Sequence, residues 1–221
     1  MDKTVAVVIR CMDYSESSQL AWLYTGDFGK IKVIAKGSRS SSKKFRTKLD
    51  LFDLADIIIY KHRRRELHTL TECNVRESFS QIRTDLRKLA TAIYMAELLD
   101  KSTGLEIPDH RIYDLILDAL KNLGRGSDPV FLKSFFEIRL MQFLGYQPRI
   151  DENDSLSQGT RAIIKRVLEA KPIDKLKISP VQLVELQNKI RLVVDSTLDK
   201  RLKSLTFLED VFNEKRNQSH G

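Results

Sequence analysis

The spacing of apolar residues changes near Phe79, and this change limits the folds open to the chain more than any other feature. Before that point apolar and polar residues alternate in short runs, as in residues 29–36. Beyond it, apolar residues recur every three or four positions, as in residues 82–102. A period of two is typical of half-buried strands, and the longer period is typical of helices that pack on one side. The sequence therefore predicts an α+β chain, with a β region in residues 1–80 and a helical region in residues 81–221.

The β region contains short segments rich in β-branched and aromatic residues, separated by turn-forming residues. These segments are 4–10, 18–25, 29–36, 52–61 and 67–75. Five short strands cannot cover both faces of an open sheet, whereas a closed barrel leaves no exposed edge. We therefore predict a five-stranded barrel of the OB-fold type, the kind of barrel that binds oligonucleotides. A small barrel of the SH3 type is the structural alternative.

The helical region is divided by glycine, proline and polar residues into segments of ordinary helix length. Three predicted helices, 82–102, 110–123 and 130–145, suit a small bundle in residues 81–147. Asp109 and Asp128 stand where residues that cap helix N-termini are expected. A polar linker follows in residues 148–159, and further helices are predicted within 160–212, including one long helix from Pro180 through 181–202. The polar tail from Asn213 is expected to fray.

A long run of cations without acids occupies residues 30–48, in a chain whose net charge is +8. Its first half alternates like a strand, with lysines predicted on the outward face, and Gly37–Ser42 reads as a mobile loop. A flexible cationic loop suits the regularly spaced phosphates of a nucleic acid. A solvated loop without a ligand is the alternative. The candidate DNA contacts in this run are Lys30, Lys32, Lys36, Arg39, Lys43, Lys44, Phe45 and Arg46.

Phe45 is placed among cations, where an aromatic ring can stack on a base or can pin the loop to the barrel. The sequence leaves both roles open. A second basic cluster follows an apolar run in the same region and adds Arg63, Arg64 and Arg65 as candidates. Two such clusters in one small domain favour nucleic-acid binding over the alternative that the cations only face solvent.

The chain lacks the motifs of the common enzyme and cofactor sites. Phosphate-binding GxxxxGK[ST] loops, GxGxxG and GxSxG strings, CxxC pairs and HExxH spacing do not occur in it. Free thiols are predicted for its cysteines, Cys11 and Cys73, and a disulfide between them is the alternative. No apolar run approaches the ~20 residues of a membrane span, and the start does not read as a signal peptide. We expect a cytoplasmic binding protein with no catalytic residue, no cofactor and no metal.

Several strings, in order along most of the chain, resemble the bacterial recombination mediator family RecO. The first covers residues 10–46 and includes Asp13, Tyr14, Glu16, Ser17, Gly29, Ala35, Lys36, Gly37, Arg39, Phe45 and Arg46. Later strings are 66–79 (ELHTLTECNVRESF), 135–148 (FFEIRLMQFLGYQP) and 198–211 (LDKRLKSLTFLEDV). Many members of that family carry four zinc-binding cysteines after the LGY-P string, and this chain has none there.

The resemblance implies a protein of DNA repair and recombination with an amino-terminal OB-fold and a helical carboxy-terminal region. It also implies binding of single- and double-stranded DNA, annealing of complementary strands, and partnership with RecR. Members bind the acidic, apolar tail of single-stranded DNA-binding protein and help to load RecA. The tail would need an apolar groove with a cation at its rim, and Lys133 and Arg139 are the candidates.

Two other functions stay open from the residues alone. An RNA-binding OB module would present the same basic loops, and relative affinity for matched RNA and DNA strands separates it from a DNA-binding protein. A non-catalytic adaptor could use the basic loop to bind an acidic protein, and salt-sensitive DNA binding would count against that reading.

Overall fold

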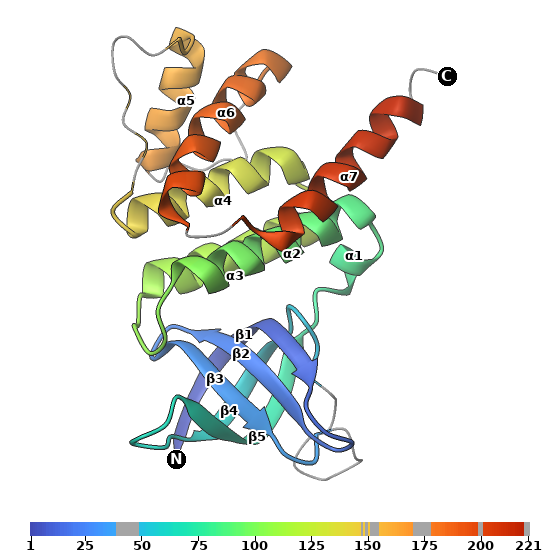
Figure 1. Ribbon diagram of the computed structural model, residues 1–221, viewed down its shortest axis with the longest axis vertical. Coiled ribbons are helices and arrows are strands. Elements are labelled where there is room, and N and C mark those ends of the chain that lie inside the picture. The colour runs from blue at the N-terminus through green and yellow to red at the C-terminus, as the bar shows by residue number, and fades with distance from the viewer. Residues whose placement is uncertain are drawn as a thin grey trace.

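The computed structural model describes residues 1–38, 49–146, 148, 150, 155–169, 178–198 and 201–218. Its lower part in Figure 1 is a β-barrel, and its upper part is helical. The strands are β1 (Asp2–Asp13), β2 (Gln19–Thr25), β3 (Gly29–Ala35), β4 (Leu54–Tyr60) and β5 (Leu67–Glu77). β2, β3 and β4 lie within the ranges predicted from the alternating pattern. β1 extends its predicted range by two residues at the start and three at the end, and β5 extends its range by two residues at the end.

The five strands close into a barrel in the order β1-β2-β3-β5-β4. Neighbouring strands are antiparallel except β3 and β5, which run parallel from the pairs Lys32–Leu67 to Ala35–Leu70. β1 closes the barrel by pairing with both β2 and β4. This is the mixed five-stranded arrangement of an OB-fold, and the predicted fold class is confirmed.

Alternating residues fill the barrel. Ala21, Leu23, Ile31, Val33 and Ala35 are fully buried inside it, as the alternation in β2 and β3 predicts. A β-bulge between Val8 and Arg10 changes the pairing of β1 with β2. Arg10 is exposed, although it has the same parity as the inward-facing Val8, because the bulge inserts one extra residue between them.

The helices follow the barrel after two residues. They are α1 (Ser80–Arg83), α2 (Leu86–Ser102), α3 (His110–Gly124), α4 (Pro129–Phe143), α5 (Gln158–Leu168), α6 (Pro180–Thr197) and α7 (Lys203–Gln218). Asp109 and Asp128 cap α3 and α4, as expected, by accepting hydrogen bonds from backbone N–H groups.

Two predicted helices have different bounds in the structure. The single helix expected in residues 82–102 is α1 followed by α2, because Asp85 caps a new helix by accepting from the N–H groups of Arg87 and Lys88. The long helix expected through residue 202 ends at Thr197, and α7 begins at Lys203. The backbone of α7 continues to Gln218, through the part of the sequence that was expected to be a frayed tail.

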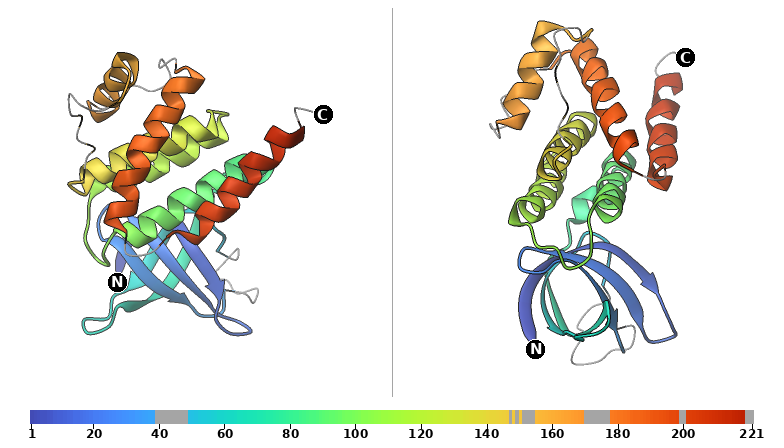
Figure 2. Two further views of the ribbon diagram at one scale, coloured as in Figure 1. Left: turned by 45° about the horizontal axis from the view of Figure 1, so that its top comes forward. Right: turned by 60° about the vertical axis from the view of Figure 1, so that its left-hand side comes forward.

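A second core joins the barrel to the helices. Val7 and Ile9 of β1 and Tyr24 of β2 belong to the same buried cluster as the apolar faces of α2, α3 and α4. Figure 2 shows α2 and α3 next to the barrel and α5 farther from the barrel than α4. Within the described parts of the chain, we find no helix with the length and apolar character needed to cross a bilayer.

Candidate nucleic-acid interface and helical groove

The turn between β4 and β5 presents the second basic cluster to solvent. Arg63, Arg64 and Arg65 are all exposed. The turn lies at the lower left of Figure 1, on the part of the barrel that points away from the helices. The backbone N–H of Arg65 donates to the carbonyl of His62 at 3.5 Å, which closes the turn. Three neighbouring guanidinium groups can therefore reach the same stretch of a phosphate backbone.

The lysines of β3 differ in their surroundings. Lys36 is exposed just beyond the end of the strand, whereas Lys32 is half-buried and lies 5.2 Å from the centre of the Trp22 ring. Lys30 is 6% exposed, and its ammonium binds the carbonyl and the carboxylate of Asp100. The predicted outward lysine row is thus wrong at Lys30, because α2 covers this end of the strand. We therefore omit Lys30 from the proposed DNA contacts.

The rest of the predicted basic loop falls outside the described residues. This applies to Arg39, Lys43, Lys44, Phe45 and Arg46. The described strand β3 leads into this segment from the end of the barrel opposite to the helices.

Lys32 was named as a DNA contact from the sequence, but the row on the outside of the barrel to which it belongs was not predicted. Arg10, Trp22 and Lys32 are directly opposite one another on β1, β2 and β3. The Arg10 guanidinium lies 4.3 Å from the centre of the Trp22 ring and 3.7 Å from the Asp100 carboxylate. The alternation in β2 and β3 places Trp22 and Lys32 on the outer face, but the bulge that turns Arg10 outward has no clear sequence signal.

The helical region contains a groove of about 920 Å³ between α2, α4, α6 and α7. Its apolar lining includes Val130, Leu183, Val184, Leu198, Leu202, Leu205, Leu208 and Phe212. Glu97 of α2 accepts from the backbone N–H groups of Lys203 and Ser204 and so fixes the start of α7 against α2. These accepted hydrogen bonds help to lower the pKa of Glu97 against the opposing effect of its burial. The groove therefore has walls held by defined contacts.

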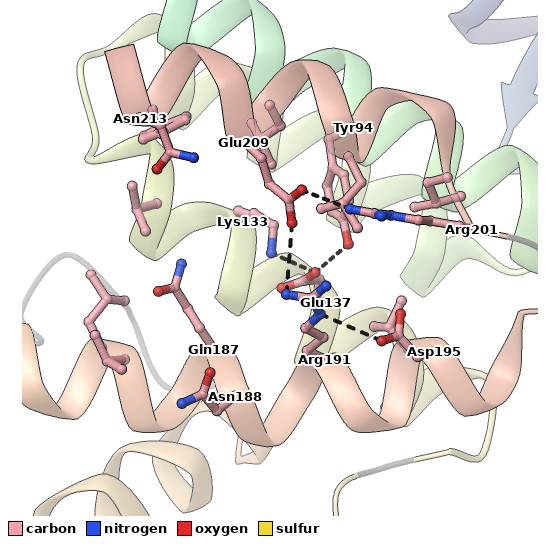
Figure 3. A pocket seen from close by; sticks show the side chains of 18 of the residues that line it. Tyr94, Lys133, Glu137, Gln187, Asn188, Arg191, Asp195, Arg201, Glu209 and Asn213 are labelled. Carbon is pink, nitrogen blue, oxygen red and sulfur yellow. Dashed lines mark hydrogen bonds and ion pairs between the residues drawn. The ribbon is translucent and has the colours of Figure 1, made fainter. Parts of the chain in front are cut away.

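Two groups of charged and polar side chains lie in the groove, and hydrogen bonds or ion pairs join the members of each group, as Figure 3 shows. On its floor, the Glu137 carboxylate accepts from the Tyr94 hydroxyl at 2.5 Å and from the Lys133 ammonium at 2.8 Å. Burial raises the pKa of Tyr94, and the neighbouring Glu137 raises it further. The other set joins α6 and α7 through Arg191 and Glu209, whose charged groups are 3.8 Å apart.

Some polar capacity in the groove is unused. The second carboxylate oxygen of Glu137 and the Nε–H of Arg87 are buried and have no hydrogen-bond partner within the described part of the chain. The Arg87 guanidinium lies 4.4 Å from the centre of the Phe212 ring. A ligand with an apolar side chain, an acidic group and an N–H donor would match these features.

The two predicted partner-binding cations take different positions. Lys133 lines the groove. Arg139 does not line it; its guanidinium donates to Gln142 at 2.7 Å and to the carbonyl of Leu168 at 3.0 Å, at the end of α5. Burial, followed by the nearby Arg111, lowers the pKa of Arg139. Arg139 thus joins α4 to α5 and lies outside this groove, and its role in partner binding stays a prediction.

Comparison with known proteins identifies the family. Residues 1–79 match the family described as "Recombination protein O N terminal", and residues 83–153 match "Recombination protein O C terminal". The chain belongs to the RecO family. The two matches cover the barrel and α2–α4, whereas α5, α6 and α7 lie beyond residue 153.

Curated RecO relatives agree with these matches. The chain is 34% identical over 152 residues to a DNA repair protein RecO of Listeria monocytogenes serotype 4b, which is 69% of this chain and 59% of the relative. It is 35% identical over 147 residues to a DNA repair protein RecO of Desulfitobacterium hafniense, which is 66% of this chain and 53% of the relative. The chain thus matches less than two thirds of the length of either relative.

Proposed function

We propose that this RecO family member is a DNA-binding recombination mediator that works by binding rather than by catalysis. In this role it anneals complementary strands and helps to load the recombinase RecA onto DNA coated by single-stranded DNA-binding protein. RecR is its proposed partner in that step. The observation that supports the proposal most is the presence of exposed cations on a closed OB-fold barrel, just beyond β3 and in the β4–β5 turn: Lys36, Arg63, Arg64 and Arg65.

These cations lower the repulsion between two polyanions. Each phosphate contact releases condensed counterions, so binding should weaken steeply with salt. The arginines can each contact two phosphate oxygens, whereas lysine acts as a point charge. Contacts of this kind read the backbone rather than the bases, so little sequence preference is expected. The proposed DNA-binding surface also includes the other predicted contacts: Lys32, Arg39, Lys43, Lys44, Phe45 and Arg46.

We further propose that the helical groove receives the acidic, apolar tail of single-stranded DNA-binding protein. The apolar lining would hold an apolar side chain, and Arg87 and Lys133 would attract acidic groups. The unpartnered Glu137 oxygen could accept from a backbone N–H of the tail.

A strand-annealing assay tests the proposal. Two complementary oligonucleotides are coated with single-stranded DNA-binding protein, mixed with the chain, and followed by fluorescence quenching between labels on the two strands. We expect the chain to accelerate annealing at low salt and to lose this effect as salt rises. Equal rates with and without the chain would contradict the annealing activity. Tighter binding to a matched RNA strand than to DNA would instead favour the RNA-binding alternative.

A further inference from the structure

The loop between α2 and α3 is packed tightly on the barrel, although it belongs to the helical region. Leu105 forms a parallel bridge with Lys30 of β3, and the N–H of Glu106 donates to the Lys30 carbonyl at 2.8 Å. Gly29 has φ +65°, and a Cβ at this position would lie 2.0 Å from the carbonyl oxygen of Ile107. Only glycine allows this close approach. The loop is therefore fixed to the barrel beside the strands that lead to the arginine turn.

The carboxylate of Glu106 joins both arms of the β4–β5 hairpin at the base of that turn. One oxygen lies 3.0 Å from the ammonium of Lys61, which directly follows β4. The other lies 2.9 Å from Nε2 of His68, which is in β5. The hydrogen bond from Lys61, followed by weaker effects that include His68, lowers the pKa of Glu106 against the opposing effect of burial. A carboxylate, with two acceptor oxygens, thus matches both partners.

A chain of hydrogen bonds continues from Glu106 into the turn. The His68 side chain is 1% exposed, and its Nδ1 accepts from the backbone N–H of His62 at 3.2 Å. Because Nδ1 is an acceptor, the neutral ring carries its proton on Nε2 and donates to Glu106. The carbonyl of the same His62 accepts from the N–H of Arg65. One carboxylate from the helical region therefore orients the backbone that carries the arginines.

The backbone of Glu106 has an uncommon conformation. Its φ is 56°, in the left-handed region that residues other than glycine seldom adopt. Such conformations persist where the surrounding contacts hold them, and they are frequent at functional sites. Here the contacts that hold Glu106 are those with Lys30, Lys61 and His68.

We propose that Glu106 is a positioning residue for DNA binding, which holds the Arg63–Arg65 turn in the orientation that contacts phosphates. This role rests on the proposed function. A preformed turn presents its guanidinium groups together, so less conformational freedom is lost when DNA binds.

Two matched substitutions separate positioning from simple charge. Glu106→Gln and Glu66→Gln each remove one negative charge near the arginines, and Glu66 is exposed within the turn. If only net charge matters, both variants bind DNA more tightly. If Glu106 positions the turn, Glu106→Gln weakens binding, because an amide supplies one acceptor and a donor where the site needs two acceptors. We expect about three- to tenfold weaker binding of a fluorescein-labelled oligothymidylate to Glu106→Gln, and unchanged or tighter binding to Glu66→Gln.

A second variant keeps the charge. Glu106→Asp is too short to contact Lys61 and His68 together, and aspartate tolerates a positive φ better than most residues. It should also weaken binding and reduce the dependence on salt, while the unfolding midpoint stays above the assay temperature. A purely structural role would lower the midpoint without changing the salt dependence of the folded protein. Tighter binding by both Glu106 variants would overturn the proposal.

A double-mutant cycle tests whether Glu106 changes DNA affinity through the arginine turn. In a background with Arg63, Arg64 and Arg65 changed to alanine, Glu106→Gln should have no further effect on DNA affinity. A full additional loss in that background would overturn the positioning role and leave the DNA-binding role of the turn intact. If the triple-alanine protein binds DNA as tightly as the parent, the turn is not a DNA contact, and both proposals for it are contradicted.

Discussion

The ammonium of Lys30 on β3 binds the backbone carbonyl and the carboxylate of Asp100 in the last turn of α2. The side chains are 8% and 10% exposed, so this pair joins the barrel to the helices in a largely water-free site. A lysine in the middle of a basic run thus stabilises the contact between the two regions.

Changing Lys30 to methionine is therefore expected to affect stability. Loss of one partner leaves the Asp100 carboxylate with the more distant Arg10, at 3.7 Å. We expect the free energy of unfolding, measured in urea, to fall by about 3 kcal/mol. The salt dependence of DNA binding by the folded variant should match that of the parent. Lys36→Met is the control, since this exposed residue should change stability by less than about 0.5 kcal/mol and weaken DNA binding.

Removal of the arginine turn is expected to act on DNA binding alone. The side chains of Arg63, Arg64 and Arg65 are exposed, so the triple alanine variant should unfold at nearly the same urea concentration as the parent. If all three contact phosphates of a single strand, the slope of log affinity against log salt should decrease by about 2. A titration at several salt concentrations measures this slope. An unchanged slope would contradict the role of the turn and would favour Lys36 and residues 39–48 as the DNA contacts.

The two cations of α4 are expected to respond differently to alanine substitution. Lys133→Ala should weaken binding of an acidic, apolar peptide with the tail sequence of single-stranded DNA-binding protein by about tenfold, because it leaves Glu137 in the groove without its cation. Arg139→Ala should leave peptide affinity unchanged and lower the unfolding midpoint, because it removes the contact with the end of α5. Fluorescence anisotropy of the labelled peptide measures the affinity of each variant, and urea unfolding measures the midpoint. Equal losses of affinity would contradict the assignment of the tail to this groove.

Cys73 is expected to be unreactive in the folded protein. Burial, with smaller contributions from Asp53 and Asp56, raises the pKa of its thiol to about 12, so the thiolate is scarce at pH 8. A thiol reagent at pH 8 should modify Cys11, which is partly exposed, before Cys73, and both should react in denaturant.

The raised pKa of Cys73 also has a consequence for stability. The unfolded thiol ionises near its ordinary pKa of 9, whereas the folded thiol stays protonated until about pH 12. The unfolded state therefore releases a proton first, and stability should decline as pH rises through this interval. Cys73→Ala should remove this part of the decline, which urea unfolding at pH 8 and pH 10 can measure.

The alternation of residues in β2 and β3 was sufficient to predict strands with one buried face, because a period of two assigns one side chain in each pair to the interior. It was not sufficient to assign the outer face. Lys30 and Lys36 have the same parity, but α2 covers Lys30 and leaves Lys36 in water. Which part of a strand a distant helix covers depends on how the two regions pack, and the local pattern carries no information about that.

The groove could not be predicted for a similar reason. Its walls come from α2, α4, α6 and α7, and the two predicted cations of α4 differ only in the helix face on which they lie. Lys133 lines the groove, whereas Arg139 contacts the end of α5, because the position of α5 decides which face of α4 is open.

The sequence by itself determined the local elements: strands from alternation, helix starts from Asp109 and Asp128, and the change from β to α structure near Phe79. These depend on interactions between residues close in the chain. Only the tertiary structure decided which charged side chains are exposed to a ligand and which bind other residues of the chain. Glu106 is separated from His68 by 38 positions, and Lys30 from Asp100 by 70. Contacts of that kind depend on the closure of the barrel and on the docking of the helices, so they arise only when the whole chain has folded.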